Sequence, residues 1–279
     1  MRIAVTGAGG FVGKELCCAL EARGHSVVPV SLRFQTSTID REMIRERLRA
    51  FEGCDVVVNA AAAKTERSNS DALINRELPK LIADLPSVRQ GDLLFLHISS
   101  MNVGISSLMD PYTISKRIAE TSLQNCQVTI VRPGLIWSFI GGDAARAIKV
   151  FRKPLPFFPV PRPGNTYRPI MIEDFVDWLC ETIETGLKAE VVSVLGDREM
   201  TMFDLLVDLA RTHAARVLPL HVNWLQFLLR PLDKYFFSHS LWQQMLTIDK
   251  GVVGEDCHRV VMLPFPKFVA KMPVKKSDS

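Results

Sequence analysis

A glycine-rich turn directly after the first apolar segment constrains the fold of this chain more than any other feature. Residues 2–6 (RIAVT) are short and apolar enough for a buried strand, and residues 7–13 (GAGGFVG) lead from it into a stretch with helical periodicity. Gly7, Gly10 and Gly13 thus form a G-x-x-G-x-x-G pattern at a strand-to-helix turn. Such a turn begins a βαβ unit, in which a helix joins two parallel strands.

The chemistry of this turn favours a phosphate ligand. Glycine allows a positive φ and a close approach of the backbone to a pyrophosphate, and the N-terminus of the following helix supplies N–H donors and partial positive charge. Phe11 and Val12 stand at that N-terminus, between Gly10 and Gly13. The turn therefore predicts a dinucleotide-binding loop, the alternative being a tight structural turn without a ligand.

The first half of the chain alternates short apolar runs with longer amphipathic stretches, which is typical of a parallel sheet covered by helices. The predicted strands are residues 2–6, 26–31, 55–59, 93–99, 128–131 and 191–195. The predicted helices are residues 11–23, 41–51, 70–85 and 111–124. The segment 32–40 is too polar to predict a further strand, so that strand is short or absent. The fold class is therefore α/β with a doubly wound parallel sheet.

The composition changes near residue 150. Five prolines alternate with large apolar residues over 154–163, which predicts an extended, polyproline-like loop that is either a stiff surface linker or the border of a ligand site. Helical spacing resumes over 201–214, 222–229 and 241–246. We expect a nucleotide-binding domain over 1–150 with a returning segment near 168–200, and a smaller, mostly helical substrate-binding region over 151–279.

Charge and cysteine content exclude several classes of protein. The 34 Lys+Arg and 30 Asp+Glu are scattered and leave a net charge of only +4, so no nucleic-acid partner is expected. Six cysteines without a C-x-x-C pair favour a reducing, cytoplasmic location, and no signal peptide or membrane-spanning run is present in the sequence. The six histidines lack paired ligand spacing, so no metal site is predicted.

The end of the second predicted strand bears on the choice of cofactor. An acidic residue that would hold the adenosine ribose hydroxyls of NAD is absent there, and Ser31 and Arg33 stand in its place. A hydroxyl with a guanidinium suits a 2′-phosphate, so NADP(H) is expected in preference to NAD(H). The alternative is that Arg33 is an ordinary solvated arginine.

A tyrosine and a lysine four residues apart begin a later helix. Asp110 is the expected N-cap and Pro111 the first helical residue, so Tyr112 and Lys116 share one face. An ammonium close to a phenol lowers the phenol's pKa and makes it a usable general acid or base. Ser99-Ser100 ends the preceding strand, where a hydroxyl can hold a carbonyl oxygen. Taken singly, these residues are also compatible with an exposed helix face and a turn.

In this chain order the motifs resemble the short-chain dehydrogenase/reductase superfamily, in its extended or atypical branch (the NAD-dependent epimerase/dehydratase family), whose members act on nucleotide-linked sugars. The resemblance covers most of the first 200 residues. It rests on residues 6–13, 55–62, Asn75, Ser99-Ser100, Tyr112 with Lys116, and 131–134. It implies a Rossmann-type sheet with a smaller C-terminal substrate-binding domain.

The resemblance also implies roles for individual residues. Tyr112 would be the catalytic acid/base, with Lys116 lowering its pKa and holding the nicotinamide ribose, and Ser100, or Ser99 in a shifted alignment, would polarise the substrate carbonyl. The residues that would line the cofactor are Asn59, Ala60, Ala61, Ala62 and Pro133. Arg168 would contact a substrate phosphate, unless it pairs with Glu173 or Asp174.

The stretch 59–62 followed by residues 73–75 is similar to the dTDP-4-dehydrorhamnose reductase group, whose members reduce a 4-keto sugar nucleotide with NADPH. The resemblance therefore implies NADPH-dependent reduction of a nucleoside-diphosphate-4-keto-6-deoxy-sugar in polysaccharide precursor synthesis. Two alternatives stay open: an epimerase or dehydratase with retained NAD, and a non-catalytic NAD(P)-binding subunit in which residues 222–232 form a partner or membrane-surface face. The sugar, the base and the oligomeric state, a homodimer included, are left open.

Overall fold

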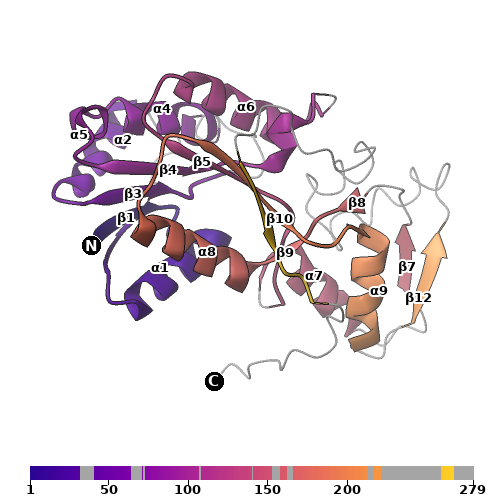
Figure 1. Ribbon diagram of the computed structural model, residues 1–279. Coiled ribbons are helices and arrows are strands. Elements are labelled where there is room, and N and C mark those ends of the chain that lie inside the picture. The colour runs from indigo at the N-terminus through magenta and orange to yellow at the C-terminus, as the bar shows by residue number, and fades with distance from the viewer. Residues whose placement is uncertain are drawn as a thin grey trace. The chain divides into compact units, whose positions relative to one another are not determined.

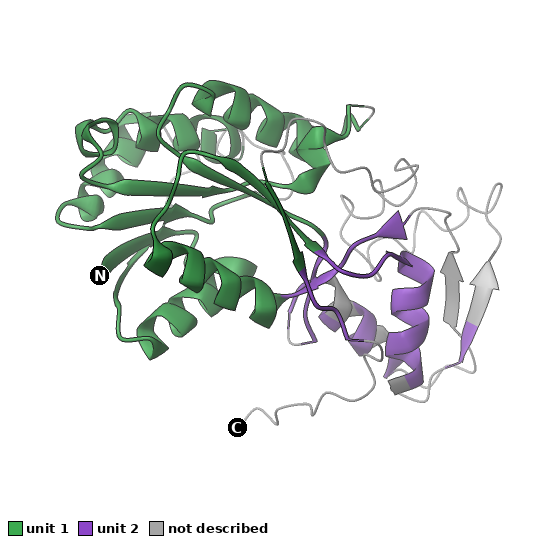
Figure 2. Cartoon of the chain, in the orientation of Figure 1, with its two compact units in different colours: residues 1–134, 172–195, 252–262 green, residues 135–171, 196–251, 263–279 purple. Residues whose placement is uncertain are grey.

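The computed structural model describes residues 1–31, 41–63, 71, 73–106, 108–139, 141–152, 158–161, 166–212, 216–220 and 259–266. Contacts divide the chain into two compact units (Figure 2). Unit 1 comprises Met1–Gly134, Ile172–Leu195 and Val252–Met262, and unit 2 comprises Leu135–Met171, Gly196–Gly251 and Leu263–Ser279. The chain thus enters unit 2 at residue 135, before the change in composition, and returns to unit 1 twice, first for a helix and a strand and later for one further strand.

Unit 1 is built on a seven-stranded sheet in the order β13-β10-β5-β4-β3-β1-β2 (Figure 1). Its strands are β1 (Arg2–Thr6), β2 (Ser26–Val30), β3 (Val56–Asn59), β4 (Leu94–Ile98), β5 (Thr129–Pro133), β10 (Val191–Gly196) and β13 (Arg259–Leu263). All pairings from β2 through to β10 are parallel. The predicted doubly wound parallel sheet is confirmed.

Helices cover both faces of this sheet (Figure 1). On one face α1 (Phe11–Ala22) packs beside α8 (Ile172–Thr185). On the other lie α2 (Arg41–Leu48) with the 3-10 turn η1 (Arg49–Phe51), the π-helical turn η2 (Leu73–Glu77), α4 (Leu78–Ala83), α5 (Pro86–Gln90) and α6 (Pro111–Leu123). The 3-10 turn η3 (Met101–Gly104) joins β4 to α6.

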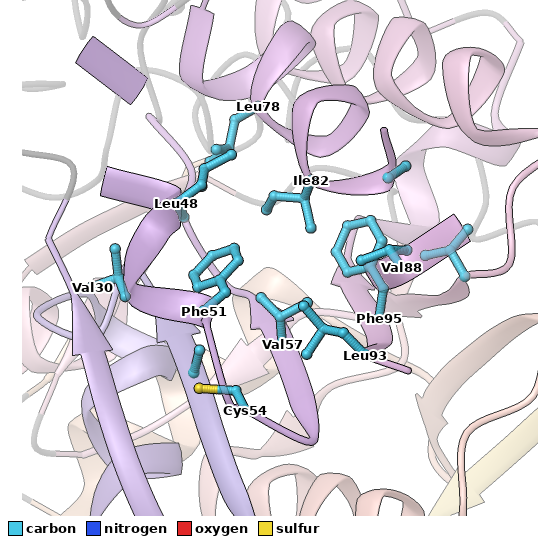
Figure 3. Close-up of a cluster of buried hydrophobic side chains, with 14 of the residues drawn as sticks. Val30, Leu48, Phe51, Cys54, Val57, Leu78, Ile82, Val88, Leu93 and Phe95 are labelled. Carbon is cyan, nitrogen blue, oxygen red and sulfur yellow. The ribbon is translucent and has the colours of Figure 1, made fainter. Parts of the chain in front are cut away.

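A hydrophobic cluster joins the second set of helices to the sheet (Figure 3). Successive side chains of a strand point to opposite faces, so the alternate residues Ala4, Val57 and Phe95 all point into this layer. Leu48 and Ile82 meet them from the helices. Each large apolar side chain buried in this way stabilises the fold by roughly 1.5–3 kcal/mol.

The predicted helix 70–85 is helical over its described residues 73–83, where the π-helical turn η2 runs directly into α4. Pro86 begins a further short helix, α5, where the prediction had only a helix end. Proline at the first helical position costs no hydrogen bond, so it can start a helix as well as stop one. Strand β13 was not predicted, because its residues are largely exposed and lack alternation. The predicted helices 222–229 and 241–246 and the segment 32–40 lie outside the described residues.

Unit 2 contains three two-stranded sheets and two helices among its described residues. Strand β6 (Ile136–Trp137) pairs with β9 (Ile170–Met171), β8 (Thr166–Tyr167) with β11 (Met200–Thr201), and β7 (Phe158–Pro161) with β12 (Val217–Leu220). The helices are α7 (Gly142–Phe151) and α9 (Met202–Thr212), the second of which was predicted. The proline-rich segment is therefore paired as a strand over 158–161. In the described part of the chain, no helix is long and apolar enough to cross a membrane.

The loops after β1 and β3 meet where the strand order reverses, because β1 lies between β2 and β3. Gly7 has a φ of 70°, and a Cβ there would lie 2.7 Å from the backbone of Ala61. A Cβ on Gly13 would lie 2.2 Å from the carbonyl oxygen of Gly7. Two glycines thus let the β1–α1 loop lie directly on its own helix and on the loop after β3.

We expect Gly13→Ala to lower the free energy of unfolding by roughly 1–3 kcal/mol, because the added methyl must push apart backbone that cannot rotate away. Gly9→Ala in the same loop is the matched control, since a Cβ there meets nothing within 4 Å. Urea denaturation followed by circular dichroism measures both. Equal effects of the two substitutions would contradict the close packing of this loop.

Candidate active site

The glycine loop presents an open helix N-terminus. Gly10 is the N-cap of α1, its N–H donates to the Gly7 carbonyl (2.8 Å), and Lys14 N–H donates back to the Gly10 carbonyl (3.0 Å). Among the described residues no side chain caps this helix. The first-turn N–H groups of α1, including those of Phe11 and Val12, are therefore left to solvent or an anion. A cradle that a Cβ would fill, next to an uncapped helix, fits the pyrophosphate of a dinucleotide.

Two residues were expected to select the cofactor. Ser31 follows β2 directly and is exposed. Arg33 lies outside the described residues, so its part in selecting the cofactor stays a prediction.

Asn59 is buried at the carboxyl end of β3 rather than exposed to a ligand. Its Oδ1 accepts hydrogen bonds from the Thr6 hydroxyl (2.6 Å) and from Ala61 N–H (3.3 Å), and its Nδ2 lies 3.1 Å from His97 Nδ1. Asn59 thus holds the loop that follows it through the hydrogen bond from Ala61. In that loop Ala61 is buried against Gly7, Ala60 is half-buried and Ala62 is exposed.

A second asparagine binds the same loop at Ala63. Asn75, buried in η2, accepts a hydrogen bond from Ala63 N–H and donates one to the Ala63 carbonyl, both at 2.8 Å. This pair of bonds mimics a strand pairing. The resemblance included Asn75 without a role, and the structure shows that it holds the loop after β3.

His97 was not selected from the sequence, yet it lies completely buried among these groups. Because Asn59 Oδ1 is occupied by two donors, Asn59 Nδ2 must donate to His97 Nδ1, and the single ring proton is then on Nε2. Burial, and next to it the charge of Lys116, hold the pKa of His97 well below its usual range. His97 is therefore a neutral imidazole.

The predicted start of α6 is confirmed: Asp110 is the N-cap, its carboxylate accepting from Thr113 N–H (3.2 Å), and Pro111 opens the helix. Lys116 is buried, with 1% of its surface exposed. Its Nζ donates to the Ile98 carbonyl at the end of β4 (2.9 Å) and lies 6.0 Å from the centroid of the Tyr112 ring. The helix thus brings both side chains to the carboxyl edge of the sheet.

Burial, rather than the nearby lysine, dominates the pKa of Tyr112 in this structure. Burial, with a smaller contribution from Asp110, raises the pKa of Tyr112 to about 12. Burial also lowers the pKa of Lys116 to about 8, and Glu120 partly opposes that shift. Lys116 Nζ donates a hydrogen bond to the Ile98 carbonyl and lies 6.0 Å from the centroid of the Tyr112 ring, so desolvation dominates for the phenol.

The structure separates the two serines that follow β4. Ser99 is buried, and its hydroxyl donates to the carboxylate of Glu120. Ser100 is half-buried and caps η3, its hydroxyl oxygen accepting from Asn102 N–H (3.3 Å). Of the two hydroxyls, that of Ser100 still has its proton to donate to an incoming oxygen.

Two further residues complete the predicted set. Pro133 ends β5 and is buried, and the next residue, Gly134, donates from its N–H to the Val194 carbonyl (2.8 Å). Arg168 belongs to unit 2, where it forms an ion pair with Glu199 (3.5 Å). Glu173 and Asp174 were the partners that the sequence suggested.

Comparison with known proteins now bears on this arrangement. Residues 1–123 match a family model described as the RmlD substrate binding domain. The search of curated proteins gave no match. At 17–18% identity, the solved structures below show likeness of fold alone.

Three solved structures illustrate that likeness. A dTDP-4-dehydrorhamnose reductase from Clostridium acetobutylicum is 17% identical with a TM-score of 0.65, over 80% of this chain and 84% of that one. The dTDP-4-dehydrorhamnose reductase from Bacillus anthracis, in complex with NADP, is 18% identical with a TM-score of 0.65, over 79% and 85%. The UDP-glucose 4-epimerase from Thermus thermophilus, in complex with NAD, is 18% identical with a TM-score of 0.60, over 78% and 86%.

The matched segment contains the glycine loop, both asparagines, Ser100 and the Tyr112–Lys116 pair, and the sheet has the strand order that a dinucleotide-binding fold requires. Residues 1–123 thus match the RmlD substrate binding domain model, and the chain shares its fold with these nucleotide-binding enzymes.

Proposed function

We propose that this protein is an NADPH-dependent reductase of a nucleoside-diphosphate-4-keto-6-deoxy-sugar. One observation carries the proposal: the segment that matches the RmlD family model contains Tyr112 and Lys116, and Lys116 Nζ is bonded to the end of β4 one residue before the serine pair. Two of the similar structures are dTDP-4-dehydrorhamnose reductases, and one of them contains NADP. These likenesses support the reaction class and the cofactor.

Tyr112 is suited to giving a proton. With a pKa of about 12 its hydroxyl is fully protonated at neutral pH, as the acid in a ketone reduction must be. In the proposed step the O–H bond of Tyr112 breaks as the ketone oxygen takes the proton. Bound NADPH supplies the hydride to the carbonyl carbon, so that the product is a secondary alcohol.

Ser100 and Lys116 serve the same step in different ways. The Ser100 hydroxyl donates to the ketone oxygen and polarises the carbonyl. The ammonium of Lys116 stabilises the tyrosinate left after proton transfer and binds a ribose hydroxyl of the cofactor. In this proposal the phosphates of the cofactor lie on the Gly7–Gly13 loop, and Arg168 of unit 2 contacts a phosphate of the substrate.

An epimerase or dehydratase with retained NAD is the second candidate, because a UDP-glucose 4-epimerase with NAD is among the similar structures. Denaturing the purified protein and identifying the released nucleotide by chromatography separates the two. A stoichiometric release of NAD would favour the second candidate, whereas exchangeable NADPH favours the reductase. A protein that binds neither nucleotide would be a non-catalytic subunit.

We expect Tyr112→Phe to lower turnover of a 4-keto sugar nucleotide by about 10²–10⁴-fold, since the proton donor is lost, while NADPH affinity stays within about twofold. NADPH consumption measures the first, and fluorescence titration the second. Tyr235→Phe removes the same atom from a tyrosine that has no assigned role and is the control. Turnover by Tyr112→Phe equal to that of the control would overturn the assignment of the acid.

Alanine at the two serines should separate catalysis from folding. Ser100→Ala is expected to reduce kcat by about 10²-fold with little change in thermal stability, because its hydroxyl acts on the substrate. Ser99→Ala is expected to lower the free energy of unfolding by roughly 1–3 kcal/mol, because a buried carboxylate of Glu120 loses a donor. Thermal melts and steady-state kinetics test both, and the reverse pattern would exchange the two roles.

The parent protein should bind NADPH at least about tenfold more tightly than NADH, and Arg33→Ala should remove most of that difference, because a charge-assisted bond to the 2′-phosphate is lost. Fluorescence titration with each nucleotide provides the measurement. Arg49→Ala, on an exposed arginine of η1, controls for the loss of one positive charge. Equal affinities in the parent protein would reject the NADP preference.

A further inference from the structure

A buried ion pair under α6 has no part in the function proposed above. Glu120 Oε1 accepts hydrogen bonds from Arg132 Nε (3.1 Å) and from the Ser99 hydroxyl, and Glu120 Oε2 accepts from Arg132 Nη2 (2.6 Å). The side chains of Arg132 and Glu120 are only 4% and 8% exposed. The two residues join α6 to the carboxyl end of β5, one helical turn beyond Lys116.

Stability alone does not account for this pair. Removing two charges from water is costly, and a buried ion pair is often no more stabilising than well-packed apolar residues of the same size. A carboxylate held by an arginine and a serine is instead a charge with a fixed position. Since residues four apart on a helix are neighbours, that charge lies beside Lys116.

The surroundings of Lys116 make Glu120 its main source of negative charge. On α6 itself Tyr112 and Glu120 flank Lys116, from β4 come the Ile98 carbonyl and His97, and from β5 comes Arg132. His97 cannot take up a proton on Nδ1 while Asn59 donates to that atom, so it adds no positive charge.

Charged side chains on η2 and α4, which pack against α6, form ion pairs with other residues. In η2, Glu77 is paired with Arg41, and in α4, Lys80 is paired with Asp84. Arg76 of η2 is half-buried and has interactions of its own. Among the described residues, Glu120 is therefore the charged side chain that acts on Lys116, and Arg132 is the partner of Glu120.

We infer that Glu120 is a positioning residue that keeps Lys116 in its ammonium form, and that Arg132 sets how much of the carboxylate's charge Lys116 experiences. The functional consequence rests on the proposed reductase, in which a charged Lys116 must stabilise the tyrosinate and bind the ribose. The direction of the pKa shifts agrees with the geometry: burial lowers the pKa of Lys116, and Glu120 opposes it.

The two partners should shift the titration of Lys116 in opposite directions. Glu120→Gln removes the counter-charge and leaves Arg132 positive, so the apparent pKa of Lys116 should fall by about one unit. Arg132→Gln leaves the carboxylate less neutralised, so the pKa should rise by a similar amount. The double variant Glu120→Gln/Arg132→Gln should fall between the two single variants.

The measurement is a pH titration of full-length protein labelled with ¹³C at the lysine ε-carbon, followed by NMR. The signal that disappears in Lys116→Arg belongs to Lys116. Its pKa is expected to be about 8, whereas ordinary lysines titrate at about 10.4. Circular dichroism establishes that each variant is folded, and the double variant, in which neither member of the ion pair keeps an unpaired charge, provides a folded comparison if a single variant is not. Glu46→Gln, at an exposed position of α2, is the control and should leave the titration unchanged.

A merely structural pair would leave the Lys116 titration in place or shift it the same way in both single variants, and either outcome would overturn the inference. If the reductase proposal holds, the alkaline limb of the pH–rate profile should move with the NMR titration in each variant. If the parent protein has no reductase activity, only the proposed function is rejected. The inference about Glu120 and Lys116 is still tested, because the NMR titration needs no substrate.

Discussion

The candidate site depends on a chain of buried hydrogen bonds that crosses the carboxyl ends of three parallel strands. Thr6 of β1 donates to Asn59 of β3, and Asn59 donates to His97 of β4. All three side chains are completely buried, so each bond that is lost would leave a polar group without water. These hydrogen bonds fix the edge of the sheet from which the glycine loop, the loop after β3 and the serine pair all begin.

The same edge is shaped by backbone packing at its loops. The β1–α1 loop lies against the backbone of Ala61, which only glycine at position 7 permits, and Asn75 holds Ala63 from the other side. A loop held in this way loses little entropy when a ligand binds, which is the advantage of a preorganised site.

Helix α6 places two charged side chains in the interior of unit 1. Its inward face carries Lys116 and Glu120, both buried, where a helix of this kind would ordinarily carry apolar residues. Burial raises the pKa of Tyr112 and lowers that of Lys116. These opposite shifts follow from one cause, because desolvation always disfavours the charged form.

The sequence by itself determined the sheet, the glycine loop, the Asp110 cap and the Tyr112–Lys116 pair, because these follow from local periodicity and from residues that require a special backbone. It did not determine the division of α4 from η2, the exposed edge strand β13, or His97, whose neighbours are distant in the chain. It also missed the separate roles of Ser99 and Ser100, since both follow β4 and only their hydrogen-bond partners in the folded chain distinguish them. Tertiary structure alone decided the proton affinities: the lysine was expected to lower the pKa of Tyr112, but desolvation and the orientation of Lys116 toward Ile98 prevailed.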